Sequence, residues 1–287
     1  MKGIIVLNKT DLSLDNQAYS IKASFENLGH FIEILRNDLT LARITNNIVG
    51  LGFSADFCIF LDKDIELARM LEKAGIRVFN RAEAIEICDD KMFTYIQLAS
   101  KGISIPDTCS LPIVYRDPYA TMNDYESILK ECGRPFVLKE NNSSLGMGVF
   151  LIKSYNDFIS RLEINRGRYL AQRFISESSG KDLRIIVIGG KAVAWMKREN
   201  YLGDFRSGIA TGGKGEEYSP QKEYIRIAEK CAKLLKLDYC GVDLLFGSNG
   251  PVLAEVNSNA LTQTMEKITG VPVTEIYARY ILSVLNK

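Results

Sequence analysis

Residues 1–80 alternate between short apolar runs and stretches in which apolar residues recur every three or four positions. The short runs predict strands, and the longer stretches predict amphipathic helices. Strands that alternate with helices form a parallel sheet covered by those helices, so residues 1–88 are predicted to be a Rossmann-like domain. No glycine-rich dinucleotide fingerprint follows the first strand, where the sequence reads Asn8-Lys9-Thr10-Asp11. The predicted strands are residues 4–7, 31–35, 56–61 and 76–79, and the predicted helices are residues 15–28 and 64–73.

Beyond residue 80 the pattern changes to one helical stretch, residues 81–101, followed by strands that come in pairs. Strands separated by short glycine-containing segments are typical of antiparallel hairpins. The chain is therefore predicted to be α/β at its N-terminal end and α+β in its C-terminal part. The further strands are predicted at residues 135–139, 149–152, 169–175, 181–188, 191–197, 242–246 and 252–256, and the further helices at residues 221–235 and 273–285.

The hairpin of residues 242–256 carries polar residues in otherwise apolar strands. Asp243 lies inside its first strand, and Glu255 and Asn257 take alternate positions of the second, so these last two point to the same face. A three-residue loop of residues 248–250, with Gly250 in the left-handed position, would place Asp243 directly opposite Glu255. The sequence thus predicts two carboxylates and an amide on one patch of sheet.

Two carboxylates at that distance are costly unless a cation lies between them. Carboxylate and amide oxygens favour Mg²⁺, which in proteins usually also holds substrate phosphates. A hairpin whose polar face is simply solvated is the alternative interpretation. The magnesium interpretation therefore requires phosphate-binding parts elsewhere in the chain.

One such part is the loop of residues 141–148, which contains serines and glycines between two predicted strands. Backbone N–H groups and hydroxyls in such a loop can bind a phosphate, and Lys139 at the end of the preceding strand adds a positive charge. The Walker order is absent, and an ordinary hairpin turn is the alternative. Residues 203–215 form a second glycine-rich segment, long enough to be a lid loop.

The composition excludes several classes of function. A net charge of +1 gives no electrostatic reason to expect a nucleic acid or a membrane surface as partner. Six cysteines without a C-x-x-C pair, and no signal-peptide or membrane-spanning pattern, predict a cytoplasmic protein with reduced thiols. His30 is the single histidine, so zinc sites with several histidines are excluded, and a Cys–His pair with His30 has no support.

Taken in chain order, these segments resemble the ATP-grasp ligases and, within them, the RimK-like amino-acid ligases. The resemblance covers nearly the whole chain, and its strength lies in the order and spacing of motifs that are individually weak. The motifs are residues 80–91 (NRAEAIEICDDK), 102–108 (GISIPDT), 139 with 144–148 (K, SLGMG), 172–175 (QRFI), 182–184 (DLR), 203–206 (GDFR), 241–243 (GVD) and 255–257 (EVN).

The resemblance implies a role for each matching residue. Arg206, Arg198 and Lys139 would offset the charge on a transferred phosphoryl group. Two Mg²⁺ ions, for which Mn²⁺ could substitute, would be held by Asp243, Glu255 and Asn257. The implied ATP-binding residues are Lys91, Lys139, Ser144, Gly146, Gly148, Gln172, Arg173, Phe174, Asp182 and Arg206.

The implied protein is an ATP-grasp enzyme with a Rossmann-like domain at residues 1–88 and two α+β subdomains at residues 89–170 and 171–287. The implied activity is an ATP- and Mg²⁺-dependent carboxylate–amine ligase that works through an acyl phosphate. It would add glutamate or another amino acid to a protein, peptide or small molecule, and it would form a homo-oligomer. The alternative is an ATP-binding module that has lost catalysis.

Three departures from the family pattern bear on that alternative. Glu140 and Ser143 replace the usual proline and glycine around the phosphate loop, and Gly208 replaces an asparagine. Gly208 is followed by Ile-Ala where Leu-His is common, and Ala260-Leu261 stands where Pro-Gly is common. The departures at 208–210 and 260–261 fall where substrates should bind. The sequence therefore leaves open which acid is activated, which amine attacks and how many residues are added.

Overall fold

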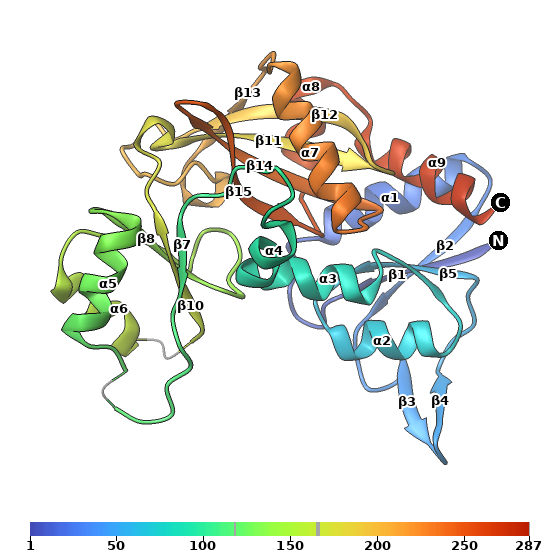
Figure 1. The fold of residues 1–287 in the computed structure, drawn as a ribbon. Coiled ribbons are helices and arrows are strands. Elements are labelled where there is room, and N and C mark those ends of the chain that lie inside the picture. The colour runs from blue at the N-terminus through green and yellow to red at the C-terminus, as the bar shows by residue number, and fades with distance from the viewer. Residues whose placement is uncertain (118, 165–166, 287) are drawn as a thin grey trace.

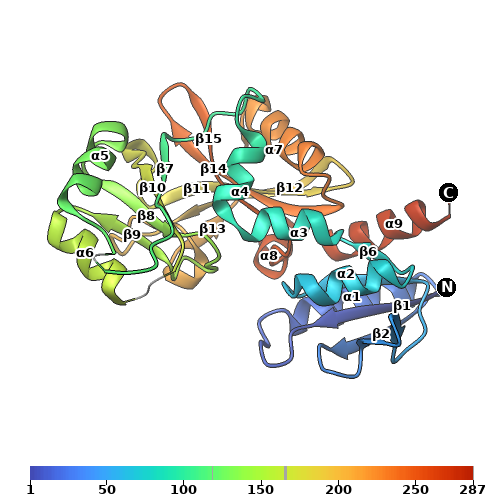
Figure 2. The same ribbon diagram turned by 60° about the horizontal axis from the view of Figure 1, so that its bottom comes forward.

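The computed structural model describes residues 1–117, 119–164 and 167–286 (Figures 1 and 2). Within these residues the chain forms three main sheets, each with helices packed on it. In Figure 1 the N-terminal sheet lies at the lower right, the C-terminal sheet above it, and the middle sheet with its two helices at the left. Mixed α/β content with one parallel and two antiparallel sheets agrees with the predicted fold class.

The N-terminal sheet is parallel, as predicted, with strand order β2-β1-β5-β6. A small hairpin, β3 and β4, was not predicted; its turn consists of Asn46 and Asn47, both at positive φ, which asparagine tolerates better than most residues. The elements are β1 (Lys2–Leu7), α1 (Asp15–Asn27), β2 (Phe31–Arg36), β3 (Ala42–Thr45), β4 (Ile48–Leu51), β5 (Phe57–Leu61), α2 (Ile65–Lys73) and β6 (Arg77–Phe79).

The helical stretch predicted at residues 81–101 is two helices, α3 (Ala82–Asp89) and α4 (Lys91–Leu98), so the single-helix prediction was wrong. Asp90 lies between them with an extended backbone, and its carboxylate accepts hydrogen bonds from the N–H groups of Met92 and Phe93. An aspartate in this position caps a new helix instead of continuing the old one. The break directs Lys91 toward the loop of residues 141–148.

The middle sheet is antiparallel, with order β7-β10-β8-β9. Two helices that the sequence patterns did not predict, α5 and α6, cover one face and share an apolar core with it. The loop of residues 141–148 joins β8 to β9, as expected. The elements are β7 (Thr108–Ser110), α5 (Met122–Cys132), β8 (Phe136–Glu140), β9 (Val149–Ile152), α6 (Tyr155–Ile164) and β10 (Tyr169–Arg173).

The C-terminal sheet is antiparallel, with order β13-β12-β11-β14-β15. The segment predicted as a lid loop at residues 203–215 contains a short 3₁₀ turn, Ile209–Thr211, and leads into β13, which pairs with β12. The elements are η1 (Ser176–Ser178), β11 (Lys181–Ile188), β12 (Lys191–Glu199), η2 (Ile209–Thr211), β13 (Lys214–Glu216), α7 (Lys222–Leu234), β14 (Tyr239–Gly247), β15 (Gly250–Asn257), α8 (Gln263–Thr269) and α9 (Val273–Leu285).

One face of β11 changes character along its length. Asp182 and Arg184 line an open cleft, whereas Ile186 and Ile188 on the same face are buried in the core shared with α1 and α9. On the opposite face of β11, Leu183, Ile185 and Val187 pack in the core that includes α7. The polar part of the strand therefore lies beyond the core that β11 shares with α1 and α9.

The division at residues 88/89 and 170/171 stays a prediction. Strand β10, which the second limit crosses, belongs by its pairing to the middle sheet. Of the helices described, none is both long enough and apolar enough to cross a membrane.

Asn80 joins the N-terminal unit to the C-terminal sheet. Its side chain is buried, donates hydrogen bonds to the carbonyls of Tyr239 (2.7 Å) and Ser258 (2.9 Å), and accepts two from the N–H groups of Asp238 (2.7 Å) and Tyr239 (3.0 Å). Four backbone groups at the two ends of the β14–β15 hairpin thus depend on one amide.

We expect Asn80→Ala to lower the free energy of unfolding by about 3 kcal/mol or more, because it leaves buried backbone groups without partners. A shift of the urea midpoint at constant slope would measure it. Asn123→Ala, on an exposed position of α5, is the control and should change stability by less than about 0.5 kcal/mol. Equal stability of the two variants would contradict this role of Asn80.

Candidate functional site

A cleft of about 680 Å³ lies between the middle and C-terminal sheets and extends to loops of the N-terminal unit. All the predicted site residues line it except Gly148. A Cβ atom at Gly148 would lie 2.5 Å from the Cβ of Ser143 and 2.8 Å from that of Glu140, and its carbonyl accepts the N–H of Glu140. Gly148 therefore closes the base of the phosphate loop rather than facing the cleft.

The β14–β15 hairpin places Asp243 opposite Glu255, as predicted, but by a different route. The loop has two residues, since Gly247 pairs with Gly250, so the three-residue loop was wrong. A bulge between Asp243 and Leu244 leaves Ala254 as the extra residue of β15 and restores the register. Gly250, the residue after this loop, has a positive φ of 112°.

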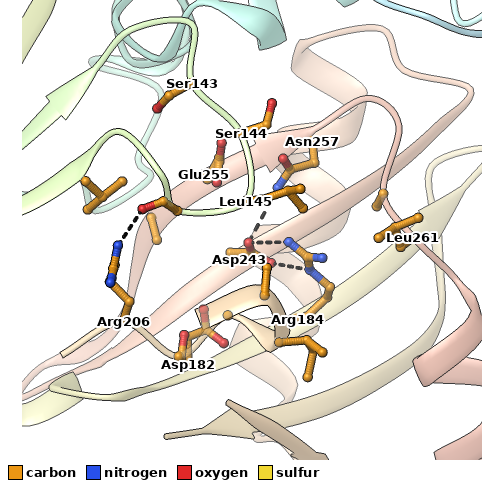
Figure 3. A pocket seen from close by; sticks show the side chains of 18 of the residues that line it. Ser143, Ser144, Leu145, Asp182, Arg184, Arg206, Asp243, Glu255, Asn257 and Leu261 are labelled. Carbon is orange, nitrogen blue, oxygen red and sulfur yellow. Dashed lines mark hydrogen bonds and ion pairs between the residues drawn. The ribbon is translucent and has the colours of Figure 1, made fainter. Parts of the chain in front are cut away.

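Two arginines bind the carboxylate of Asp243, and Figure 3 shows one of them, Arg184. Arg184 on β11 donates to both of its oxygens at 2.7 and 2.6 Å, and Arg198 on β12 lies 3.0 Å from Oδ2. Arg198 also pairs with Asp182, which gives a buried chain of two carboxylates and two guanidinium groups. Burial raises the pKa of Asp243, but the two guanidinium groups outweigh it and lower that pKa to about 2.

The cation required beside Asp243 is thus supplied at least partly by the protein. Arg184 was not among the predicted site residues. The sequence does show that Arg184 lies two residues after Asp182 and therefore on the same face of β11. Its proximity to Asp243, however, depends on the pairing of β11 with β14, which no local pattern reveals.

Lys91 and Lys139 approach the cleft from two elements. The Nζ of Lys91 donates to the carbonyl of Ser143 and lies 3.5 Å from a carboxylate oxygen of Glu255. The Nζ of Lys139 lies 3.4 Å from the Tyr95 hydroxyl. Burial lowers the pKa of Lys139 to about 8, although Glu255 and Asp243 oppose the shift. Lys139 is therefore a cation that a bound anion would stabilise strongly.

The phosphate loop is attached to both neighbouring units. Lys63, which follows β5, donates to the Ser144 hydroxyl at 2.9 Å and forms an ion pair with Asp89. On the other side Arg206 donates to the carbonyl of Gly146 at 2.8 Å while paired with Asp204. Lys63 was missed by sequence reasoning, since it lies in the N-terminal unit, far from any phosphate motif.

The strand end that follows Ala171 links the two halves of the cleft. Gln172 donates to the Thr108 hydroxyl at 2.9 Å, and the ring of Phe174 packs on that of Phe205 with centroids 6.2 Å apart. The guanidinium of Arg173 pairs with Asp107. These contacts hold the linker backbone at the wall of the cleft, with an aromatic ring beside it.

The predicted metal ligands offer only part of a coordination shell. Within the described ranges, no group of three or more His, Cys, Asp or Glu side chains could hold a metal ion. Glu255 is about one-third exposed, and the amide nitrogen of Asn257 lies 3.4 Å from Asp243, which leaves its amide oxygen available. Glu255 and the Asn257 amide oxygen fit a Mg²⁺ ion that takes its remaining ligands from phosphates and water, whereas Asp243, both of whose oxygens accept from Arg184, would have to share them with the metal.

The RimK-like ATP-grasp domain family matches residues 88–281. The chain belongs to this family. A probable alpha-L-glutamate ligase of Maridesulfovibrio salexigens is 36% identical to this RimK-like chain over 220 residues, which cover 75% of the chain and 70% of that ligase. Human beta-citrylglutamate synthase B is 34% identical over 227 residues, 78% of the chain and 58% of the synthase.

The solved structures agree on the fold. A RimK domain ATP-grasp protein from Sphaerobacter thermophilus superimposes with a TM-score of 0.75 at 18% identity, over 98% of this chain and 99% of that one. The predicted ATP-grasp fold is confirmed. Family membership likewise confirms an ATP-dependent ligase that joins a carboxylate to an amine.

We expect the affinity for ADP to fall as the pH rises from about 7 to about 9, because Lys139, with its pKa lowered to about 8, loses its charge over that range. Bound phosphates favour the protonated form, so binding near pH 8 should take up a proton. Calorimetric titration in buffers of different ionisation enthalpy measures both effects.

Two variants of Lys139 serve as references for this experiment. Lys139→Met should bind weakly at every pH in the range, and Lys139→Arg, whose guanidinium stays charged, should bind with little pH dependence. A wild-type profile as flat as that of Lys139→Arg would show that Lys139 does not titrate at the phosphates.

Proposed function

We propose that this chain transfers the γ-phosphoryl group of ATP to a substrate carboxylate and then forms an amide bond at the activated carbon. The carboxylate oxygen displaces ADP and becomes an acyl phosphate. The amine then attacks the carbonyl carbon, phosphate leaves with the bonding electrons, and the amine loses a proton. The observation that carries the proposal is the convergence of the Asp182–Arg198–Asp243–Arg184 chain with Lys91 and Lys139 in one cleft.

In this proposal the chain contributes position and charge rather than a nucleophile. Lys91 and Lys139 bind phosphate oxygens from one side, and Arg206 and Arg198 offset charge on the transferred group from the other. Ser144 and Gly146 close over the phosphates. In doing so Ser144 gives up its hydrogen bond with Lys63, and Gly146 gives up its hydrogen bond with Arg206. The backbone from Gln172 to Phe174 would receive the adenine, and Asp182 would hold Arg198 in place and lie at the nucleotide.

Asp243, Glu255 and Asn257 are proposed to hold Mg²⁺, with two ions as the expected number and Mn²⁺ as a substitute. When bound, the metal would neutralise charge on the phosphate oxygens. The chain orients these ligands through Arg184 and Arg198, which fix Asp243, and through the hairpin register that sets Glu255 beside it.

One substrate is proposed to be an amino acid. The other is a small molecule, peptide or protein that supplies the amine or carboxylate to which the amino acid is joined. Glutamate occurs in the names of both relatives described above. Gly208, Ala260 and Leu261 depart from the family pattern at the substrate end of the cleft, so glutamate is one candidate among amino acids. A homo-oligomeric state and a cytoplasmic location stay predictions.

We expect ATP hydrolysis to ADP by the purified chain to require both an amino acid and an acceptor. A screen of amino acids and short peptides, with phosphate release as the first readout and mass spectrometry of products as the second, tests this. Tight ATP binding without a ligated product for any pair would favour the non-catalytic alternative.

Glu255→Gln should lower turnover by about 100-fold or more, because it removes a charge from the metal and phosphate region. It should leave stability nearly unchanged, since Glu255 carries only one long ion pair, to Lys91, among the described residues. Higher Mg²⁺ should recover part of the activity. Full activity of this variant at limiting Mg²⁺ would show that Glu255 is not a ligand.

Two companion variants sharpen the comparison. Glu126→Gln, on an exposed position of α5, should change neither turnover nor stability. Asp243→Asn should lose turnover and also about 3–5 kcal/mol of stability, because it leaves Arg184 and Arg198 without their shared partner. Thermal unfolding separates the two effects.

A further inference from the structure

Part of the lining of the cleft is apolar. Leu14, Leu145, Ile209 and Leu261 belong to this lining and come from four separate segments. Leu145 is 53% exposed and Ile209 is 42% exposed although both border the cleft. Figure 3 shows Leu145 and Leu261 among the side chains of this cavity, near the paired Asp243 and Arg184. We call these four residues the apolar corner.

Buried contacts hold one wall of the apolar corner in place. Gln17 on α1 is buried, donates to the carbonyl of Ala260 at 3.1 Å and accepts from the N–H of Thr262 at 3.0 Å. The residue between these two partners, Leu261, is thereby fixed next to the start of α1, where Leu14 lies. This wall is preformed, as small-molecule sites usually are.

The opposite wall is held by the contact between two loops. A Cβ atom at Gly146 would lie 3.2 Å from the Thr211 side chain, and Arg206 bonds the Gly146 carbonyl. Leu145 precedes Gly146 in one loop, and Ile209 lies between Arg206 and Thr211 in the other. Leu145 has a φ of 57°, a costly conformation for a bulky residue, and such strain is concentrated at functional sites.

The charges in the cleft disfavour a second carboxylate at the apolar corner. Asp11 and Asp62 line the same cleft, and Lys63 is already paired with Asp89. A carboxylate there would meet like charges and no unpaired arginine. Each arginine that lines the cleft is paired, in the combinations Arg173–Asp107, Arg184–Asp243, Arg198–Asp182 and Arg206–Asp204.

We propose that the apolar corner binds the aliphatic side chain of the amino-acid substrate, so that this chain selects an aliphatic amino acid over glutamate. The inference rests on the ligase function proposed above and specifies its substrate class. Apolar side chains that are exposed in a cleft gain from covering by an apolar ligand, whereas a carboxylate placed there would lose its hydration without gaining a partner. Leu261 and Ile209 are the residues that determine this preference.

Binding of norleucine and glutamate to the full chain, saturated with Mg²⁺ and a non-hydrolysable ATP analogue, tests the proposal. Their side chains are similar in length and differ in the carboxylate. Calorimetric titration should show norleucine binding about tenfold tighter or more, the scale on which apolar pockets discriminate. Tighter binding of glutamate, or no measurable binding of norleucine, would overturn the proposal.

Charge substitutions provide the second arm. Leu261→Arg should reverse the preference toward glutamate, and Ile209→Arg, on an exposed turn, repeats the test should the first variant fail to fold. Leu202→Arg is the matched control: Leu202 is 83% exposed and does not line the cleft, so its substitution should leave both affinities unchanged. An unchanged ratio of affinities in both corner variants would contradict the assignment.

Turnover separates this inference from the proposed function. Tighter binding of norleucine without a ligated product in any pairing would reject the ligase proposal and keep the apolar corner. Efficient ligation of glutamate without ligation of norleucine would support the ligase proposal and contradict the proposed specificity of the apolar corner.

Discussion

The carboxylate of Asp243 is the charge on which the rest of the cleft depends. It is buried in the middle of the C-terminal sheet and stays ionised because Arg184 and Arg198 bind it. Arg198 in turn needs Asp182, so the four side chains form one unit across three strands. Such a unit is costly to assemble but holds each charge in a single position. That precision suits phosphoryl transfer, in which positioning and charge account for most of the catalysis.

The position of this four-residue unit follows from how helices α1 and α9 cover the C-terminal sheet. The same face of β11 bears charged residues at one end and isoleucines at the other, and the change occurs where α1 and α9 begin to cover it. Asn80 and Gln17 add buried hydrogen bonds across this contact. The N-terminal unit, which lacks a nucleotide fingerprint, therefore contributes to the lining of the cleft, and Lys63 brings it into contact with the loop of residues 141–148.

Sequence patterns predicted most of the strands and the helices that alternate with them, since apolar periodicity reports burial on one face. They failed where a single polar contact decided the structure. Asp90 turned one predicted helix into two by capping the second. At the β14–β15 hairpin the predicted loop was one residue longer than the observed one, and the prediction contained no bulge. These two errors cancelled, so the predicted pairing of Asp243 with Glu255 is the observed one. Helices α5, α6 and α8 went unpredicted.

The sequence by itself determined which chemical groups the site contains: the carboxylates and amide of one hairpin, two lysines, a serine- and glycine-rich loop, and their order along the chain. Only the tertiary structure decided how the charges are paired. Arg184 beside Asp243, Lys63 on Ser144 and the apolar corner each join segments far apart in the chain. Sheet order and domain packing set these distances, and neither leaves a periodic pattern in the local sequence.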